Sequence, residues 1–195
     1  MYELRTHKNS LRAEYREKRA ALPKEMKEAC DEKICALFMS LVTYRYADVL
    51  LMYAPLPDEI NVMPLAEAAL KGGKRICFPR CSPKDRSMVF CYVEDISQLE
   101  SGIYGIREPM ENLRQYRSGD AEHPVCLIPG ILFDHEGYRL GYGKGYYDRY
   151  LPGFGGTKVG LIYSEFLLDA VPRGRFDLSV DLLVTEKGVK ALHAN

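Results

Sequence analysis

Residues 139–150 combine side chains that few purely structural segments need together. Glycine occupies every second position at Gly141, Gly143 and Gly145, and an acid follows at Asp148. Glycine lets the backbone turn its N–H groups toward a ligand, and several N–H groups oriented in this way form a concavity that suits phosphate. A nearby carboxylate supplies the hard oxygen that Mg²⁺ binds beside nucleotide phosphates. The segment therefore predicts a phosphate site, and a glycine-rich connector between a strand and a helix is the structural alternative.

The position of this segment in the chain favours the phosphate site. It follows a short apolar run at 125–128, which is bounded by Pro129 and Gly130 and is typical of a buried strand. Strand-to-helix turns are common phosphate sites in α/β proteins. The segment lacks the glycine spacing of the dinucleotide fingerprint, and no Ser or Thr follows Lys144 as a P-loop requires. If the loop binds ATP, it does so by another design.

Periodicity along the rest of the chain indicates the elements that would position this loop. Residues 97–117 show no strong period, and we expect them to lie irregularly over the surface near the ligand. Apolar residues at helical spacing predict helices over 7–22, 24–41 and 63–70, with a further helix after the glycine loop. Short apolar runs predict strands over 48–54, 75–79, 88–93, 125–128, 158–163 and 181–185.

Alternating strands and helices predict an α/β fold, an open and largely parallel twisted sheet flanked by helices in three layers, α/β/α. We expect all 195 residues to form one domain. In such sheets ligands bind beyond the carboxyl ends of the strands. The loops after residues 54 and 128 would therefore lie on the ligand side.

Composition excludes several classes of partner. The formal net charge is zero, from 27 basic and 27 acidic residues, so no overall field favours nucleic acid. No apolar run approaches the roughly 20 residues that span a bilayer, and we expect no membrane partner. The six cysteines form no C-x-x-C pair and no secretory signal accompanies them, which predicts reduced thiols in a cytoplasmic protein. We expect a monomer that binds small molecules.

The sequence of residues 140–151, LGYGKGYYDRYL, resembles the signature of the 5-formyltetrahydrofolate cyclo-ligase family, also called methenyltetrahydrofolate synthetases. The resemblance implies an enzyme that converts 5-formyltetrahydrofolate to 5,10-methenyltetrahydrofolate, with ATP as co-substrate, Mg²⁺ as cofactor, and ADP and phosphate as products. Other blocks agree in the expected order, so the resemblance spans nearly the whole chain. These blocks are KNSLR at 8–12, DEIN at 58–61, YGIREP at 104–109, Asp177, and VTE at 184–186.

Near the start of the chain, Lys8 and Arg12 are four residues apart and would share one face of the first helix. Spacing alone leaves a solvated basic face as the alternative, because neighbouring positions are equally basic. The resemblance implies that this pair contacts the ATP phosphates. It also implies that Arg12, Arg139 and Lys144 are the catalytic cations, and we expect no protein nucleophile. The implied ATP-binding residues are Lys8, Asn9, Ser10, Leu11, Arg12, Arg139, Leu140, Gly141, Tyr142, Gly143, Lys144, Gly145, Tyr146 and Tyr147.

Glu59 follows Pro57 and Asp58 just past a predicted strand, where an acid is commonly a surface turn residue or the start of a helix. The resemblance implies that Glu59 binds the folate. A carboxylate is well shaped to accept hydrogen bonds from the pterin amino and ring N–H groups. The family often has Thr where this chain has Val62, so a hydroxyl contact is absent there. The implied folate-binding residues are Tyr53, Glu59, Tyr142, Gly143, Lys144, Gly145 and Tyr146, so that one loop would hold both reactants.

Asp148 and Asp177 are distant in sequence, and the resemblance implies that both are Mg²⁺ ligands. From the residues alone, Asp148 could be a helix N-terminal acid paired with Arg149 or another neighbour, and Asp177 a turn residue. Many relatives have His immediately before the second acid, whereas this chain has Phe176. The four histidines match no motif, and we expect them to be structural or solvated.

The sequence leaves two other functions open. One is a folate- or nucleotide-binding protein without turnover, which tight folate binding without ATP consumption would favour. The other is a sugar-phosphate isomerase or a related phosphate-handling enzyme on a similar sheet, whose activity would be indifferent to ATP. The Lys8 and Arg12 pair and Glu59 argue against the second function.

Overall fold

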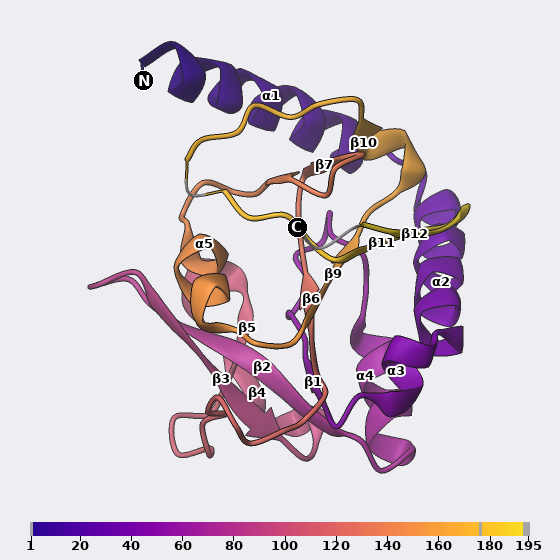
Figure 1. Cartoon of the computed structure of the whole chain (residues 1–195), viewed down its shortest axis with the longest axis vertical. Coiled ribbons are helices and arrows are strands. Elements are labelled where there is room, and N and C mark those ends of the chain that lie inside the picture. The colour runs from indigo at the N-terminus through magenta and orange to yellow at the C-terminus, as the bar shows by residue number, and fades with distance from the viewer. Residues whose placement is uncertain (1, 176, 193–195) are drawn as a thin grey trace.

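The computed structural model describes residues 2–175 and 177–192, and it has a mostly parallel sheet at its centre (Figure 1). The seven strands of this sheet follow the order β12-β11-β9-β6-β1-β2-β3. The inner strands are parallel, and the edge strands β3 and β12 are antiparallel to their neighbours. The predicted α/β class is confirmed. The strands are β1 (Val49–Leu51), β2 (Arg75–Ser82), β3 (Ser87–Val93), β6 (Pro124–Ile128), β9 (Thr157–Leu161), β11 (Leu182–Thr185) and β12 (Gly188–Ala191).

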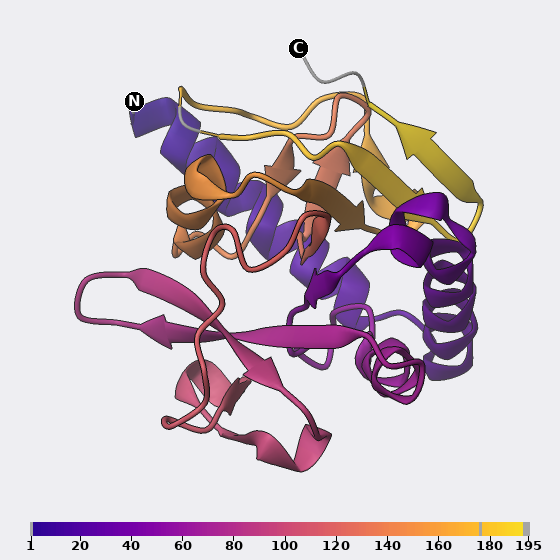
Figure 2. The same cartoon turned by 60° about the horizontal axis from the view of Figure 1, so that its bottom comes forward.

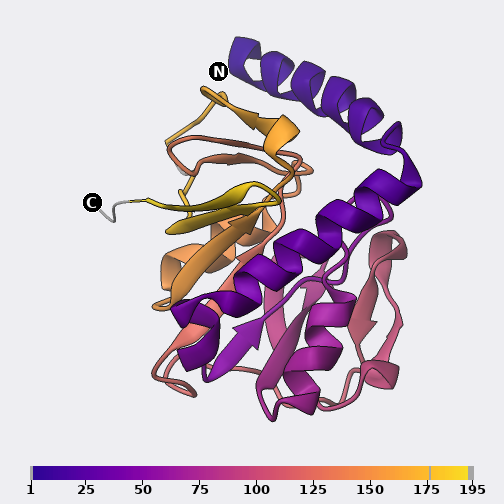
Figure 3. The same ribbon diagram turned by 90° about the vertical axis from the view of Figure 1, so that its right-hand side faces the viewer.

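Helices flank this sheet on both faces (Figures 1 and 3). The helices α2 (Lys24–Ser40), α3 (Val42–Tyr46) and α4 (Met63–Lys71) lie on one face, and the short α5 (Tyr146–Tyr150) lies on the other, against β3. In α2, Ile34 and Phe38 are four residues apart and fully buried, as the helical spacing of apolar residues predicts. The first helix, α1 (Tyr2–Ala20), begins earlier than the predicted 7–22 and ends before Pro23. Its opening turns are polar and carry no apolar period, so the pattern did not mark its start.

Short strands form two further sheets that the sequence did not predict. A three-stranded sheet pairs β10 (Leu167–Leu168), β7 (Leu132–Asp134) and β8 (Arg139–Leu140), and a two-stranded sheet pairs β4 (Leu99–Ser101) with β5 (Arg107–Pro109). The expectation that 97–117 is wholly irregular is therefore wrong. Strands of two or three residues are too short to show an alternation of apolar and polar positions. Figure 2 shows the β4 and β5 pair beside the long β2 and β3 hairpin.

The core lies on both faces of the central sheet. Every residue of β1 and of β6 is buried, which accounts for their unbroken apolar runs. The predicted strand 48–54 is shorter than expected, because Met52, Tyr53 and Ala54 continue into the core after the ladder ends. The six cysteines are free thiols, as expected. Within the described residues, no helix combines the length and the apolar character needed to cross a membrane.

Candidate active site

Loops at the carboxyl ends of β1 and β6 meet the glycine segment and α1 around a cavity of about 470 Å³. A volume of this size suits a small-molecule ligand. Most of the residues singled out from the sequence line this one cavity, although they come from distant parts of the chain. These lining residues are Lys8, Arg12, Tyr53, Glu59, Arg139, Leu140, Gly141, Tyr142, Gly143, Lys144, Gly145, Tyr146, Tyr147, Asp148 and Asp177.

Three predicted ATP-binding residues of α1 are not among the residues that line the cavity. Asn9 supports a residue that does, because its Oδ1 accepts a hydrogen bond of 2.8 Å from Arg12 Nη1. Leu11 packs against the hydrophobic core, and Ser10 is exposed. On a helix, adjacent positions point in different directions, so within the block 8–12 Lys8 and Arg12 share the cavity face while the three residues between them do not.

The glycine segment joins β8 to α5, and two of its glycines adopt left-handed backbone angles. Gly143 has φ +87° and Gly145 has φ +74°, a region that residues with a Cβ atom rarely adopt. At Gly143 an added Cβ would lie 3.2 Å from Arg12 Cζ. Arg12 Nε also donates to the Gly141 carbonyl at 2.8 Å. The arginine of α1 therefore lies directly on the loop, and the absence of a side chain at Gly143 leaves room for it.

Two ion pairs join predicted phosphate-binding cations to predicted metal ligands. Arg139 Nη2 donates to Asp148 Oδ1 at 2.6 Å, and Lys8 Nζ donates to Asp177 Oδ2. Arg139 is largely buried, whereas the Asp148 side chain is 36% exposed. Asp148 is thus paired with Arg139 and not with Arg149, which instead donates to the Lys144 and Gly145 carbonyls.

The two carboxylates are suitable donors for magnesium. Both are hard oxygen ligands on the wall of one cavity, and Mg²⁺ commonly takes one or two protein carboxylates together with substrate phosphate oxygens. Across residues 2–175 and 177–192, no group of three or more His, Cys, Asp or Glu side chains could hold a metal by itself. A metal at this site would therefore depend on oxygen atoms of the ligand. Phe176, which precedes the second acid, lies outside the described residues.

Glu59 is a buried acid on the loop after β1. It is 5% exposed, and burial raises its pKa to about 7 although the nearby positive charge of Arg19 opposes the rise. Its Oε2 accepts a hydrogen bond of 2.9 Å from the Leu56 backbone N–H. Tyr53 lies behind the loop, and its hydroxyl donates to the Ile60 carbonyl at 3.1 Å. An acid buried in a ligand-sized cavity is a strong candidate for recognition of a polar ligand.

Several residues that the sequence analysis did not select also line the cavity. Glu108 is 6% exposed, burial raises its pKa, and its Oε1 accepts a hydrogen bond of 3.2 Å from the Cys81 backbone N–H. It belongs to the block 104–109 that carried part of the family resemblance, and this block was the available signal. The other residues of this kind are Arg16, Ala54, Leu56, Pro79, Cys81, Met88, Ile106 and Pro129.

Tyr147 places a buried hydroxyl beside the cavity. Within the described part of the chain, its oxygen has no hydrogen-bond partner. Its ring lies under the Arg139 guanidinium, with 5.8 Å from Cζ to the ring centroid. Buried polar groups without a partner are rare in folded proteins, and at a cavity wall such a group indicates a ligand or water that completes it.

The fold and the cavity define an α/β protein with a small-molecule site at the carboxyl ends of its parallel strands, where a glycine turn, several cations and a buried acid meet. The sequence model of the 5-formyltetrahydrofolate cyclo-ligase family matches residues 5–186. The chain belongs to that family.

Individual relatives agree with this assignment. The solved structure of Aquifex aeolicus 5,10-methenyltetrahydrofolate synthetase is 34% identical, has a TM-score of 0.85, and the match covers 96% of this chain and 94% of that chain. The structure of a Mycoplasma pneumoniae 5,10-methenyltetrahydrofolate synthetase is 26% identical with a TM-score of 0.73, covering 92% and 98%. A probable 5-formyltetrahydrofolate cyclo-ligase of Schizosaccharomyces pombe is 26% identical over 93% of this chain and 96% of the relative.

Proposed function

We propose that this protein converts 5-formyltetrahydrofolate to 5,10-methenyltetrahydrofolate, with Mg²⁺-dependent conversion of ATP to ADP and phosphate. Membership of the cyclo-ligase family supports this proposal. The structural observation that carries it is the composition of one cavity, which has the buried acid Glu59 on one loop, the glycine segment with Lys144 on another, and Arg12 of α1 beside that segment. A folate and a triphosphate need these two kinds of group within reach of each other.

The substrate explains why ATP is needed. The formyl group on N5 is a poor electrophile, because the nitrogen donates electrons into the carbonyl and an oxide is a poor leaving group. Transfer of the γ-phosphoryl group to the formyl oxygen would give an imidate-like phosphate and ADP. N10 would then attack the formyl carbon and lose its proton, and departure of phosphate would leave the methenyl bridge. No covalent intermediate on the protein is required.

In this proposal the residues of the chain bind, orient and neutralise charge, as is general for phosphoryl transfer. Lys8, Arg12, Arg139 and Lys144 would face the negative charge of the triphosphate, and the glycine segment would offer backbone N–H groups. Glu59 would accept hydrogen bonds from the pterin. Asp148 and Asp177 would hold Mg²⁺, which when bound would supply further neutralisation of phosphate charge. The remaining lining residues would exclude water from the reacting atoms.

The protein would act as a cytoplasmic monomer without a nucleic-acid or membrane partner. The zero formal net charge supports the absence of a nucleic-acid partner. Size-exclusion chromatography with light scattering tests the oligomeric state, and a dimer at micromolar concentration would contradict it.

The decisive experiment mixes the purified protein with 5-formyltetrahydrofolate and MgATP. The near-ultraviolet absorbance of the conjugated methenyl product is followed beside a parallel assay for ADP. We expect both signals to grow together and to require Mg²⁺. Folate binding with neither signal would indicate a binding protein without turnover, and no folate binding at all would contradict the proposal.

A further inference from the structure

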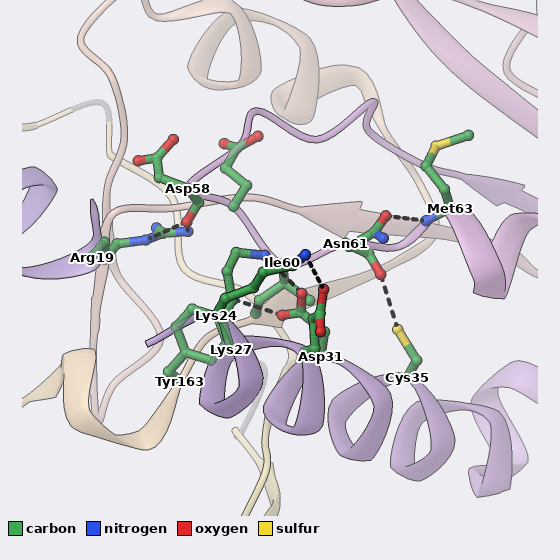
Figure 4. Close-up of polar contacts among 12 residues, drawn as sticks. Arg19, Lys24, Lys27, Asp31, Cys35, Asp58, Ile60, Asn61, Met63 and Tyr163 are labelled. Atoms are coloured by element: carbon green, nitrogen blue, oxygen red, sulfur yellow. Dashed lines mark hydrogen bonds and ion pairs between the residues drawn. The ribbon is translucent and has the colours of Figure 1, made fainter. Parts of the chain in front are cut away.

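Arg19, near the end of α1, is a buried cation outside the set of predicted site residues. It is 3% exposed, and its guanidinium contacts backbone carbonyls of two different loops; Figure 4 shows the contact with Asp58. Nε donates to the Asp58 carbonyl at 2.9 Å, Nη2 donates to the same oxygen, and Nη1 donates to the Gly130 carbonyl at 2.6 Å. Three donors on a rigid, planar group thus fix the relative positions of two loops.

Each of these loops carries one wall of the cavity. Asp58 directly precedes Glu59, and its side chain accepts a hydrogen bond of 3.0 Å from the Tyr142 hydroxyl of the glycine segment. Gly130 is the second residue after the strand β6, and the next backbone N–H, that of Ile131, donates to the Leu140 carbonyl at 2.8 Å. The guanidinium therefore connects the acid-bearing loop to the start of the glycine segment.

The charge of Arg19 is not explained by an ion pair. Within the described residues it forms none, and its guanidinium also lies over the ring of Tyr163, 5.8 Å from Cζ to the ring centroid. Burying a cation is costly, and carbonyl groups alone could be tied by a neutral donor such as Gln. The cavity acid Glu59 is close enough for the positive charge of Arg19 to lower its pKa.

We propose that Arg19 is a positioning residue for folate binding, because its buried guanidinium holds the Glu59 loop against the glycine segment and supplies the positive charge that faces Glu59. This inference rests on the proposed function for the identity of the ligand. It concerns the pterin side of the cavity and not the phosphate side.

The rest of the Glu59 loop has its own anchors, so that loss of Arg19 would act locally. The Ile60 carbonyl accepts from the Tyr53 hydroxyl. The Asn61 carbonyl accepts from Cys35 Sγ of α2 at 3.7 Å, as Figure 4 shows. In this loop the arginine contacts Asp58, the residue directly before Glu59. We therefore expect the substituted protein to fold with the sheet and α2 intact.

The ionisation of Glu59 provides a readout that a merely structural arginine would not move. If the ionised carboxylate accepts the pterin hydrogen bonds, folate affinity falls as pH falls through the Glu59 pKa of about 7. Loss of the Arg19 charge raises this pKa further, so the decline begins at a higher pH. The charged and titratable groups that face Glu59 are Arg19 of α1, Asp58 of its own loop, Tyr53 after β1, Tyr142 of the glycine segment and Tyr147 of α5.

The test measures dissociation constants for 5-formyltetrahydrofolate and for MgATP separately by titration calorimetry between pH 5.5 and 9. The variants are Arg19→Gln, which removes the charge, and Arg19→Lys, which keeps the charge but loses the planar guanidinium that contacts both loops. Lys18→Gln is the matched control, because this neighbouring lysine of α1 is half exposed and its contacts, with Glu14 across one turn and with the Tyr15 ring, stay on α1 itself. The thermal midpoint of each variant is recorded in the same buffers.

For Arg19→Gln we expect the folate dissociation constant to rise about 10-fold and the MgATP dissociation constant to change less than about twofold. The loss of folate affinity on acidification should begin at a higher pH than in the wild type. Arg19→Lys should weaken folate binding less and leave the decline at the wild-type pH. Equal weakening for both ligands, or a pH profile that matches Lys18→Gln, would overturn the inference. If Arg19→Gln fails to fold, Arg19→Lys alone tests the inference. An Arg19→Lys variant with the folate affinity of the wild type would then overturn it. Because binding is measured without turnover, a wild-type protein that binds folate but makes no product would defeat the proposed activity and leave this test valid.

Discussion

The Arg139 guanidinium donates to the Asp148 carboxylate across 2.6 Å, so that a cation suited to phosphate and an acid suited to magnesium are partners in this structure. The same arrangement recurs between Lys8 and Asp177. Under the proposed function, a magnesium nucleotide would compete for both partners, because its phosphate oxygens would attract the cation and its metal would attract the carboxylate. The pairing preserves charge balance in a cavity where a lone buried arginine would be costly.

Replacement of one partner tests this relationship. We expect Asp148→Asn to lower turnover at saturating MgATP by about 100-fold, because phosphate charge is less well neutralised. The free energy of unfolding should fall by about 1–2 kcal/mol, less than for a fully buried pair because the Asp148 side chain is 36% exposed. Steady-state kinetics and urea unfolding measure the two effects. The control is Glu14→Gln, which breaks the exposed Glu14–Lys18 pair and should change the free energy of unfolding by less than about 0.5 kcal/mol. An equal loss of stability in both variants would show that the Arg139–Asp148 pair contributes no more than an exposed pair.

Glu59→Gln should stabilise the folded protein at alkaline pH while weakening folate binding. The folded-state pKa of about 7 lies above the ordinary value of 4.5, so proton binding favours the folded state. The contribution of Glu59 to stability is therefore fully present below pH 4.5 and is lost as pH rises through 7. Above that range we expect the variant to be more stable by up to about 3 kcal/mol. Urea unfolding at pH 5 and pH 8.5 measures the difference in the free energy of unfolding between the variant and the wild type. A variant that is less stable than the wild type at both pH values would refute the prediction.

Gly143→Ala should disturb Arg12 and the glycine segment together. The φ of +87° disfavours any side chain, and the new Cβ would lie 3.2 Å from Arg12 Cζ. We expect a loss of about 1 kcal/mol in the free energy of unfolding and a rise of about 10-fold in KM for ATP. At Gly153 an added Cβ meets nothing within 4 Å, which makes Gly153→Ala the control. If both variants bind ATP equally well, the contact between Arg12 and the loop is not needed for the nucleotide.

Tyr147→Phe removes the buried hydroxyl that lacks a partner in the described structure. Without ligands, we expect stability to stay constant or to rise by about 1 kcal/mol, because an unsatisfied buried group is removed. Ligand affinity should fall about 10-fold if a ligand atom completes the hydroxyl. The comparison variant is Tyr163→Phe, whose hydroxyl donates to Asp31 at 2.6 Å and whose loss should destabilise by about 1–2 kcal/mol. Thermal unfolding of both variants, with and without each ligand, measures these effects. An equal loss of stability in Tyr147→Phe and Tyr163→Phe would be inconsistent with a Tyr147 hydroxyl that lacks a hydrogen-bond partner.

The sequence by itself determined the α/β class, the buried strands and the position of the glycine segment. These features depend on local patterns, since a strand covered on both faces needs a continuous apolar run and a left-handed turn needs glycine. The block 140–151 also sufficed to indicate the family. The short strands β4, β5, β7 and β8 escaped prediction, because two or three residues carry no readable period and their pairing depends on distant partners.

Only the tertiary structure decided which side chains meet. Arg19 carries no distinguishing local signal, and Glu108 has only its place in the block 104–109; the importance of both comes from burial against segments far along the chain. The ion-pair partners of Asp148 and Asp177 could not be predicted from the sequence either, because ion pairing depends on distances between elements and not on spacing within them. Packing of α1 across the carboxyl ends of the strands brings these groups together, and that packing follows from the burial of apolar surface by the whole chain.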